Sequence, residues 1–323
     1  MYKEVGLLAL YCESAVHAGS GSDLGVIDLP IQREKATRYP IFQASTLKGA
    51  IRASFDSEMA IQNSLLKGVF DNFNFSNQDK ADLEAAINLV FGDEGSQSAA
   101  AISFTDAKIL LFPVKSVKNV FSWVTCPSVL GRLKRDLEIA GIESDWNIPK
   151  LEKEAAISPK LKLDDFTKDK IVLEEYAFDI SRDKEIEKIA KWISENIFAS
   201  QDDYFSSKLE EDLIILSDEE FEDFVTMSTE VVARTKIKNE TKVVQDGALW
   251  YEENLPAESV LYSLAMTTNV LREDKSDIRD DLKQADDILN FFAEGLQARI
   301  QLGGNETIGR GIIKTKLVKG GAK

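Results

Sequence analysis

The stretch EVGLLALYCESAVHAGSGSDLGVIDLPIQRE, residues 4–34, decides the fold of the first part of the chain. Residues 4–12 form an apolar run with no charge after Glu4, which is typical of a buried strand. Between Ser14 and Pro30 the composition changes to Gly, Ser and Asp, which indicates a loop. The stretch therefore predicts a core strand that runs directly into a glycine-rich loop.

Helix and strand patterns are mixed irregularly after this loop. Ser45 is a predicted helix N-cap, and Leu47, Ile51 and Phe55 recur every four residues behind it, as on the apolar side of a helix. Further strands are expected at 102–114, 121–126, 170–180, 229–238 and 259–270, and further helices within 60–97 and 202–224 and over 128–140, 183–197 and 276–296. Because strands and helices do not alternate strictly, an α+β fold is favoured over a doubly wound sheet. The chain shows no repeat or obvious linker, so we expect a single domain, 1–323.

Composition and charge limit the possible functions. The 323 residues are 44% apolar, enough for a normal core, and no apolar run approaches the roughly 20 residues that cross a bilayer. Two cysteines and the lack of a signal-peptide pattern predict a cytoplasmic protein without a disulfide framework, a zinc site or a membrane contact. The net charge of −16 argues against simple nucleic-acid binding, but the charged residues are distributed unevenly along the chain. Residues 202–223 are strongly acidic, whereas 33–52 and 108–135 are basic.

Three glycine-rich segments could bind phosphate groups. The loop at 17–34 has flexible backbone and hydroxyl donors, the helix start at 44–52 is followed by two cations, and the loop at 302–313 contains four glycines. The candidate RNA-binding residues in these three segments are Gly19, Ser20, Gly21, Arg33, Ser45, Lys48, Arg52, Gly303, Gly304 and Arg310. The loop at 17–34 is neither a Walker loop nor a dinucleotide fingerprint. Ordinary surface loops and a capped surface helix are the alternative interpretation.

Asp28 is the candidate catalytic group within the first loop. A carboxylate in that partly apolar stretch could bind a divalent cation or take a proton from a ribose 2′-hydroxyl. The alternative is that Asp28 only caps backbone N–H groups of the loop. His17 is the only histidine, so no serine–histidine–acid triad is predicted.

The segment 229–256 has the pattern of an RNA-binding hairpin. Arg234, Lys236 and Lys238 alternate, which places three cations on one face of a strand. We expect a turn near residues 239–241, a break in the returning strand at Gly247, and adjacent aromatic side chains at Trp250 and Tyr251. Cations with nearby aromatics suit single-stranded RNA, which binds through backbone charge and base stacking. An ordinary solvated hairpin is the alternative.

The order and spacing of four segments resemble a known family. HAGSGSDLGVIDLPIQRE, YPIFQASTLKGAIR, ALWYEENLP and LGGNETIGRGI together resemble the fourth-subunit family of the Cmr, or type III-B, CRISPR effector, which belongs to the Cas-seven group of the RAMP superfamily. The resemblance runs from about residue 4 to 318. It is weakest in 56–98, 140–168 and 181–225, and we expect variable insertions at 56–98 and 181–225.

The resemblance implies a fold, partners and an activity. The fold would be a modified RNA-recognition-motif (ferredoxin-like) RAMP fold with helical insertions and a protruding β-hairpin thumb at about 236–252. Copies of the chain would stack as a helical filament along guide CRISPR RNA, together with other Cmr subunits. The thumb would displace a base of the guide–target duplex at regular intervals, and the chain would act there as an endoribonuclease on complementary target RNA.

The resemblance also implies roles for single residues. The aspartate assigned to cleavage in the family falls on Asp28. The resemblance also implies that cleavage uses a divalent metal (Mg²⁺ or Mn²⁺), which Asp28 could hold, and no organic cofactor. His17, Tyr251 and Glu252 are candidates for supporting roles. One departure from the family pattern is the run Lys35-Ala36-Thr37-Arg38, where a basic residue followed by His-Thr-Gly is expected.

Other functions remain open from the residues alone. The chain could be a guide-RNA scaffold without catalysis, the equivalent subunit of the related Csm complex, or a stand-alone RNA-processing endonuclease. A small-molecule phosphate enzyme is the alternative that rests on the glycine loops by themselves.

Overall fold

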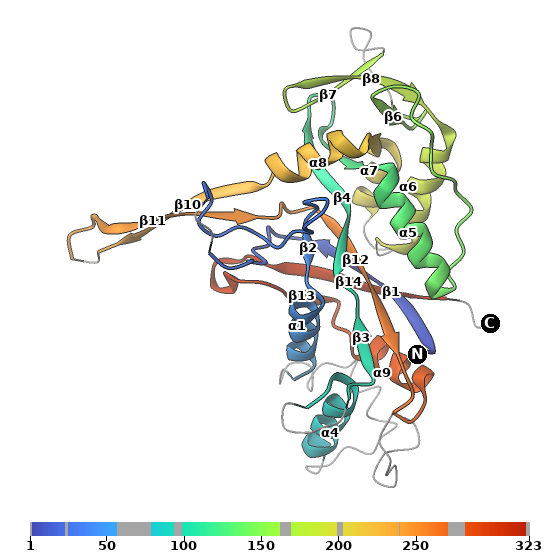
Figure 1. The fold of residues 1–323 in the computed structure, drawn as a ribbon, viewed down its shortest axis with the longest axis vertical. Coiled ribbons are helices and arrows are strands. Elements are labelled where there is room, and N and C mark those ends of the chain that lie inside the picture. The colour runs from blue at the N-terminus through green and yellow to red at the C-terminus, as the bar shows by residue number, and fades with distance from the viewer. Residues whose placement is uncertain are drawn as a thin grey trace.

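The computed structural model describes residues 2–22, 25–56, 79–93, 99–161, 169–198, 203–238, 240–270 and 282–320 as a mixed α+β fold (Figure 1). The described helices are α1 (Ala44–Asp56), α4 (Asp79–Phe91), α5 (Pro127–Ala140), α6 (Lys184–Asn196), α7 (Asp203–Asp212), α8 (Asp218–Met227) and α9 (Ala285–Gly295). The strands are β1 (Glu4–Cys12), β2 (Ile41–Phe42), β3 (Ile102–Phe104), β4 (Ala107–Ser116), β5 (Val120–Thr125), β6 (Ala155–Ile157), β7 (Lys170–Leu173), β8 (Tyr176–Arg182), β9 (Ile214–Leu216), β10 (Glu230–Ile237), β11 (Val244–Asn254), β12 (Val260–Thr267), β13 (Arg299–Gln301) and β14 (Ile312–Lys319).

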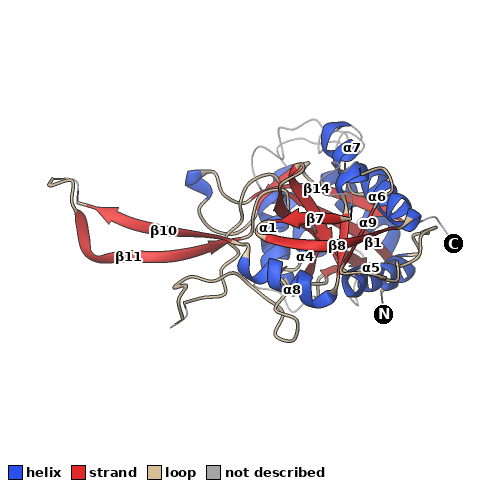
Figure 2. Cartoon of the chain, turned by 90° about the horizontal axis from the view of Figure 1, so that it is seen from above, coloured by secondary structure: helices blue, strands red, loops and turns tan. Residues whose placement is uncertain are grey.

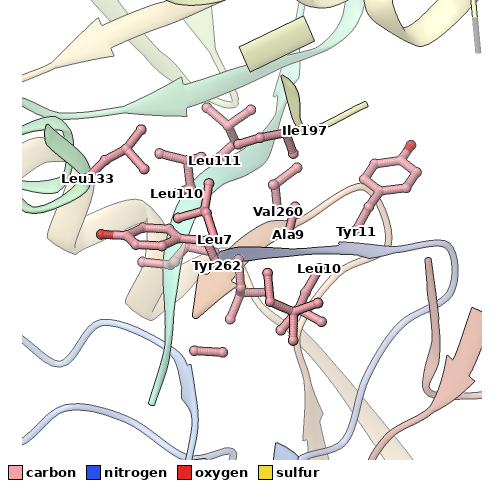
Figure 3. Close-up of a cluster of buried hydrophobic side chains, with 14 of the residues drawn as sticks. Leu7, Ala9, Leu10, Tyr11, Leu110, Leu111, Leu133, Ile197, Val260 and Tyr262 are labelled. Carbon is pink, nitrogen blue, oxygen red and sulfur yellow. The ribbon is translucent and has the colours of Figure 1, made fainter. Parts of the chain in front are cut away.

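The centre of the main sheet has the strand order β14-β1-β12-β4, with every neighbouring pair antiparallel. Helix α1 follows β1 and β2 in the chain, and α9 and β13 lie between β12 and β14. Both α5 and α9 contact β1. Figure 3 accordingly shows Ala9 and Tyr11 on one side of the β1 ribbon and Leu10 on the other. Because both faces are covered, β1 can be apolar at almost every position, as its sequence predicted.

An aromatic cluster joins the helices at one end of this sheet. The ring of Phe55 on α1 lies 5.0 Å from that of Phe91 on α4 and 6.2 Å from that of Phe292 on α9, and Phe104 on β3 lies 5.4 Å from Phe292. A Cβ atom at Gly295 would overlap the Phe55 ring, so α9 approaches α1 closely because this position lacks a side chain. The expected apolar stripe of α1 is thus part of the core.

Two segments that were expected to be single strands are divided. The strand expected at 102–114 is split into β3 and β4 at Thr105–Asp106, and the Asp106 carboxylate accepts a hydrogen bond from Ala44 N at 2.7 Å. The strand expected at 170–180 is a hairpin, β7–β8, whose turn contains Glu174 with φ 51°. Both predictions were wrong because an apolar β pattern continues across a short turn.

The helix expected at 276–296 begins later. Among the described residues it is α9, which starts at Ala285 and has a capping box between Gln284 and Asp287. The first part of the expected helix, 276–281, lies outside the described residues, as do 57–78 and 94–98 of the expected insertion.

Strands β10 and β11 form a separate two-stranded sheet that projects far from the body (Figures 1 and 2). The predicted break at Gly247 is wrong, because β11 continues through it. The register instead shifts, since Thr235 pairs with Leu249 but Ile237 pairs with Val244, so the hairpin is irregular near its tip. In the part of the chain that the structure describes, no helix is long and apolar enough to cross a membrane.

Candidate nucleic-acid interface and active site

Asp28 is attached to the root of the hairpin, which is the regularly paired part of β10 and β11 from Glu230 to Thr235 and from Leu249 to Asn254. Its Oδ2 accepts a hydrogen bond from the backbone N–H of Tyr251 at 2.7 Å. The adjacent Leu29 pairs with Glu252 in a parallel bridge, with Leu29 N donating to Tyr251 O and Glu253 N donating to Leu29 O, both at 3.0 Å. Asp28 does cap a backbone N–H, but one on β11 rather than in its own loop. The residue is part-exposed beside the projecting hairpin.

His17 lies between the first loop and the C-terminal glycine loop. Its Nδ1 is 2.7 Å from Glu253 O. Because a carbonyl oxygen can only accept a hydrogen bond, Nδ1 carries a proton, and Nε2 is the other ring nitrogen. Gly304 N donates to His17 O at 2.9 Å. A Cβ at Gly303, where φ is +84°, would overlap His17 O, and a Cβ at Gly19 would lie 2.9 Å from His17 Nε2. These two glycines are therefore needed for the close approach of His17.

Glu252 is a buried carboxylate on β11. Its Oε1 accepts from Asn305 Nδ2 at 2.8 Å and from Arg234 at 3.1 Å. Burial raises the pKa of Glu252, but the hydrogen bonds from Asn305 and Arg234 and the positive charges of Arg234 and His17 outweigh it, so the net pKa is lowered. Glu252 is thus ionised at neutral pH, and it connects the C-terminal glycine loop to the hairpin root.

Several predicted RNA-binding arginines are bonded within the protein. Arg33 donates to Arg38 O, Val225 O and Glu253 Oε1, and Arg310 donates to Glu230 Oε2 at 3.0 Å. Arg234 is engaged with Glu252. The bond to Val225 O shows that α8, part of the acidic segment, touches the loop that contains Asp28. Arg33 is placed to hold this loop, which its position in a basic segment did not indicate.

The α1 candidates lie on a different element from the hairpin root. Helix α1 begins at Ala44, so Ser45 is inside the first turn and not the N-cap that was predicted; Asp106 supplies the acceptor for Ala44 N. Lys48 Nζ donates to Ile102 O at 3.3 Å, and burial and the charge of Arg52 lower its pKa. Arg52 donates to Gly92 O and Asn88 Oδ1. The start of α1 reaches the site loop, where Gln32 donates to Thr46 Oγ1 at 3.2 Å.

Most of the remaining candidates are exposed. Ser20 and Gly21 lie on the surface, and Ser20 Oγ donates to Pro30 O at 3.2 Å. Lys236 and Lys238 extend along the exposed part of the hairpin. Trp250 is half-buried and pairs with Arg234, while Tyr251 is exposed and pairs with Ala233. The hairpin thus presents cations and an aromatic side chain to solvent.

The expected divalent ion would have few ligands from the described part of the protein. Within the described ranges, no three His, Cys, Asp or Glu side chains come together as metal ligands. The described residues therefore do not form a protein-only metal site. The second carboxylate oxygen of Asp28 fits an ion of the Mg²⁺ type, which proteins often bind through one or two carboxylates together with phosphate oxygens of the substrate.

Comparison with known proteins identifies the fold that builds this site. The family model of the RAMP superfamily matches residues 9–314. The chain belongs to the RAMP superfamily. Within that superfamily it is 37% identical over 317 residues to a Pyrococcus furiosus protein named CRISPR system Cmr endoribonuclease Cmr4, with 96% of this chain and 95% of the relative covered. This similarity places the chain in the Cmr4 family.

One further relative and two solved structures are also similar to the chain. A Saccharolobus solfataricus protein named CRISPR system CMR subunit Cmr4 is 27% identical over 321 residues, covering 93% of this chain and 92% of that protein. The crystal structure of oligomeric Cmr4 from Pyrococcus furiosus superposes with a TM-score of 0.70 at 29% identity, covering 99% of both chains. A cryo-EM structure of the type III-B Cmr-beta bound to cognate target RNA has a TM-score of 0.67 at 23% identity, covering 98% of both chains, and shows the likeness in fold.

Proposed function

We propose that this chain is the repeated backbone subunit of a type III-B CRISPR–Cmr complex, binds guide RNA, and cleaves complementary target RNA at regular intervals. The observation that carries the proposal is the attachment of Asp28 to the root of the projecting hairpin, through the Tyr251 N–H at 2.7 Å. The Pyrococcus furiosus relative, named an endoribonuclease, supports the reaction type.

The finer description of the fold belongs to this proposal. The antiparallel order β14-β1-β12-β4, with α1 after β1 and α9 after β12, supports the ferredoxin-like arrangement. The β10–β11 hairpin supports the thumb, which would then span Glu230–Asn254 and so begin earlier than residue 236. The exposed Lys236, Lys238 and Tyr251 would meet RNA backbone and bases.

The chemistry proposed is attack of a ribose 2′-oxygen on the adjacent phosphorus. The O2′–P bond forms, the P–O5′ bond breaks, the 2′-hydroxyl proton passes to Asp28, and the leaving 5′-oxygen takes a proton from water. The products are a 2′,3′-cyclic phosphate and a 5′-hydroxyl. Glu252 is unsuited to donate this proton because it is held ionised. His17 uses Nδ1 to bond Glu253 O, so its Nε2 is the ring nitrogen that would orient the RNA. Such positioned proton transfer contributes about 10²–10⁴-fold in rate.

A divalent ion, Mg²⁺ or Mn²⁺, would be held by Asp28 together with RNA phosphate oxygens. When bound, it would stabilise the charge that develops on the phosphate. The partners proposed are guide CRISPR RNA, target RNA, further copies of this chain in a helical filament, and the other Cmr subunits, in the cytoplasm.

The test is cleavage of end-labelled complementary RNA by the complex reconstituted with guide RNA and partner subunits. Asp28→Asn keeps a side-chain acceptor for the Tyr251 N–H but removes the base, so cleavage should fall by about 100-fold or more with target binding intact. Regularly spaced products ending in a cyclic phosphate are expected from the wild type in Mg²⁺ or Mn²⁺. A mutant that cuts at the wild-type rate would exclude Asp28 as the catalytic group.

A scaffold without catalysis is the second candidate. Its RNA binding would need only the exposed cations and the exposed Tyr251 of the hairpin. In that case the wild-type complex would bind guide and target RNA but leave the target intact in either metal.

A further inference from the structure

Glu253 is a buried carboxylate at the point where the hairpin returns to the body. Its side chain is only 3% exposed, although it lies two positions from the exposed Tyr251. The sequence pattern did not single it out, because it is one of two adjacent acids after an aromatic pair. Burial of a charge is costly unless it is fully paired, so the partners of Glu253 reveal what it holds.

The side chain of Glu253 accepts from three donors. Oε1 accepts from Arg33 at 2.5 Å and from Thr229 Oγ1 at 2.8 Å, and Oε2 accepts from Ile31 N at 3.0 Å. Ile31 and Arg33 belong to the segment that contains Asp28, while Thr229 lies just before β10. One carboxylate thus connects the Asp28 segment to the start of the hairpin.

The backbone of Glu253 contacts the same site. Its N–H donates to Leu29 O at 3.0 Å, and its C=O accepts from His17 Nδ1 at 2.7 Å. Leu29 in turn is adjacent to Asp28, whose carboxylate is bonded to Tyr251 N. The segment from Asp28 to Arg33 is therefore attached to β11 at several places, and the side chain of Glu253 makes the bonds at its far end.

We infer that Glu253 is a positioning residue for the cleavage reaction: its carboxylate holds the Asp28–Arg33 segment against the hairpin root, so that Asp28 and the hairpin keep one relative placement. The inference rests on the proposed function of Asp28. Glu253 itself, buried and fully engaged by Arg33, Thr229 and Ile31, does not reach the RNA.

The negative charge and the two acceptor oxygens are both required. All three side-chain partners are donors, and a carboxylate offers only acceptors. A glutamine of the same size offers one acceptor and one N–H₂ donor. In Glu253→Gln, a donor must therefore face either Ile31 N–H or the Arg33 and Thr229 donors, which leaves buried groups unpaired.

The experiment uses the reconstituted complex with guide RNA, and compares Glu253→Gln with the wild type in single-turnover cleavage and in target-RNA binding. We expect the cleavage rate to fall by about 100-fold, as for a displacement of a reacting group by about 1 Å, with the target-RNA Kd changed less than about threefold. Hydrogen exchange should accelerate in peptides covering 25–34 and 248–256, because Ile31 N–H and Tyr251 N–H lose their fixed acceptors.

Glu34→Gln is the matched control. Glu34 lies one residue after Arg33 and also accepts from an arginine, Arg132 at 2.8 Å, but on α5 rather than the hairpin. This variant should cleave at the wild-type rate and leave exchange at 248–256 unchanged. If Glu253→Gln does not assemble, Glu253→Asp keeps the charge with a side chain one methylene shorter, and should slow cleavage at unchanged binding.

The outcomes separate the two proposals. Wild-type cleavage and wild-type exchange in Glu253→Gln, with Asp28→Asn inactive, would overturn the positioning role alone. Full activity of Asp28→Asn would overturn the proposed catalysis, whereas the exchange result would still report whether Glu253 holds the segment. Equal effects of Glu34→Gln and Glu253→Gln would show general destabilisation and also contradict the inference.

Discussion

Glu252 and Glu258 lie six residues apart and have opposite electrostatic surroundings. Glu252 is held ionised by Asn305, Arg234 and His17. Glu258 is in the turn between β11 and β12 with φ 69°, and its Oε2 is buried without a hydrogen-bond partner among the described residues. Burial raises the pKa of Glu258 to about 7. Glu252 near the hairpin root thus stays charged, while Glu258 in the turn that follows β11 binds a proton near neutral pH.

Glu258→Gln should therefore change how stability depends on pH. The folded pKa of about 7 lies above the unfolded value of 4.5, so the folded state binds more protons between these values and the wild type loses stability as pH rises from about 4.5 to 7. Glutamine resembles the protonated acid and does not titrate. Between pH 5 and 7.5, the free energy of unfolding of the variant should rise relative to that of the wild type by about 1–2 kcal/mol. This is less than the full pKa shift implies, because the side chain is part-exposed.

Urea unfolding of both proteins at a series of pH values measures this difference. Because other groups titrate equally in both proteins, only the gap between the two curves matters. Parallel curves would show that Glu258 titrates alike in the folded and unfolded states.

At the scale of elements, the hairpin is stabilised mainly at its root. Its base is tied to the body through Tyr251, Glu252 and Glu253, and Arg310 of the glycine loop bonds Glu230. Beyond Thr235 the register shifts, and Ile237 and Val244 are exposed. Because an isolated two-stranded ribbon is marginally stable in water, the outer hairpin is the part that a bound partner would order.

Replacing both Lys236 and Lys238 with Ser should weaken RNA binding without affecting stability. Both side chains are exposed, so the change removes two cations that would neutralise phosphates and leaves the core packing intact. The slope of log K against log salt should become shallower by about 1 for each phosphate that the variant no longer neutralises. Binding of labelled guide RNA between about 50 and 300 mM salt measures this slope.

The control replaces Lys150 and Lys153, exposed in the loop after α5, with Ser. It changes the net charge equally but should leave the slope unaltered. If both double variants weaken binding alike, total charge matters and the hairpin has no special role.

At the scale of the whole molecule, the aromatic cluster of Phe55, Phe91, Phe104 and Phe292 connects three helices to one end of the sheet. The site lies at the hairpin side, where loops from both ends of the chain meet β11. The aromatic cluster and the candidate site thus lie in different regions, although α1 contributes to both through its core stripe and its first turn near Gln32.

Phe292→Ala should lower stability by about 3–5 kcal/mol, because it leaves a cavity among three aromatic rings. The decrease should be seen as a lower Tm and a lower urea midpoint. At a temperature where the variant is folded, its assembled complex should cleave at the wild-type rate, because the rings around Phe292 belong to α1, α4 and β3 rather than to the hairpin root. A loss of cleavage with an intact fold would show that the two regions are coupled.

Local patterns in the sequence determined the α+β class, β1 as a buried strand, the helices at 128–140 and 183–197, and a basic hairpin after residue 229. These features depend on the order of apolar and polar residues over one or two turns, which a single segment carries by itself. The resemblance in four short segments led to the family and to Asp28.

The tertiary structure alone decided which side chains act together. Asp28 and Tyr251 are 223 positions apart, Arg33 and Glu253 are 220 apart, and His17 and Glu253 are 236 apart. No local period reports such pairings, so the sequence indicates neither the bond of Arg33 to Glu253 nor the importance of Glu253 itself. For the same reason Ser45 was taken for a helix cap that Asp106, brought close by the turn between β3 and β4, provides instead. Local structure depends on neighbouring residues, whereas the site forms only because folding brings two distant loops to one strand.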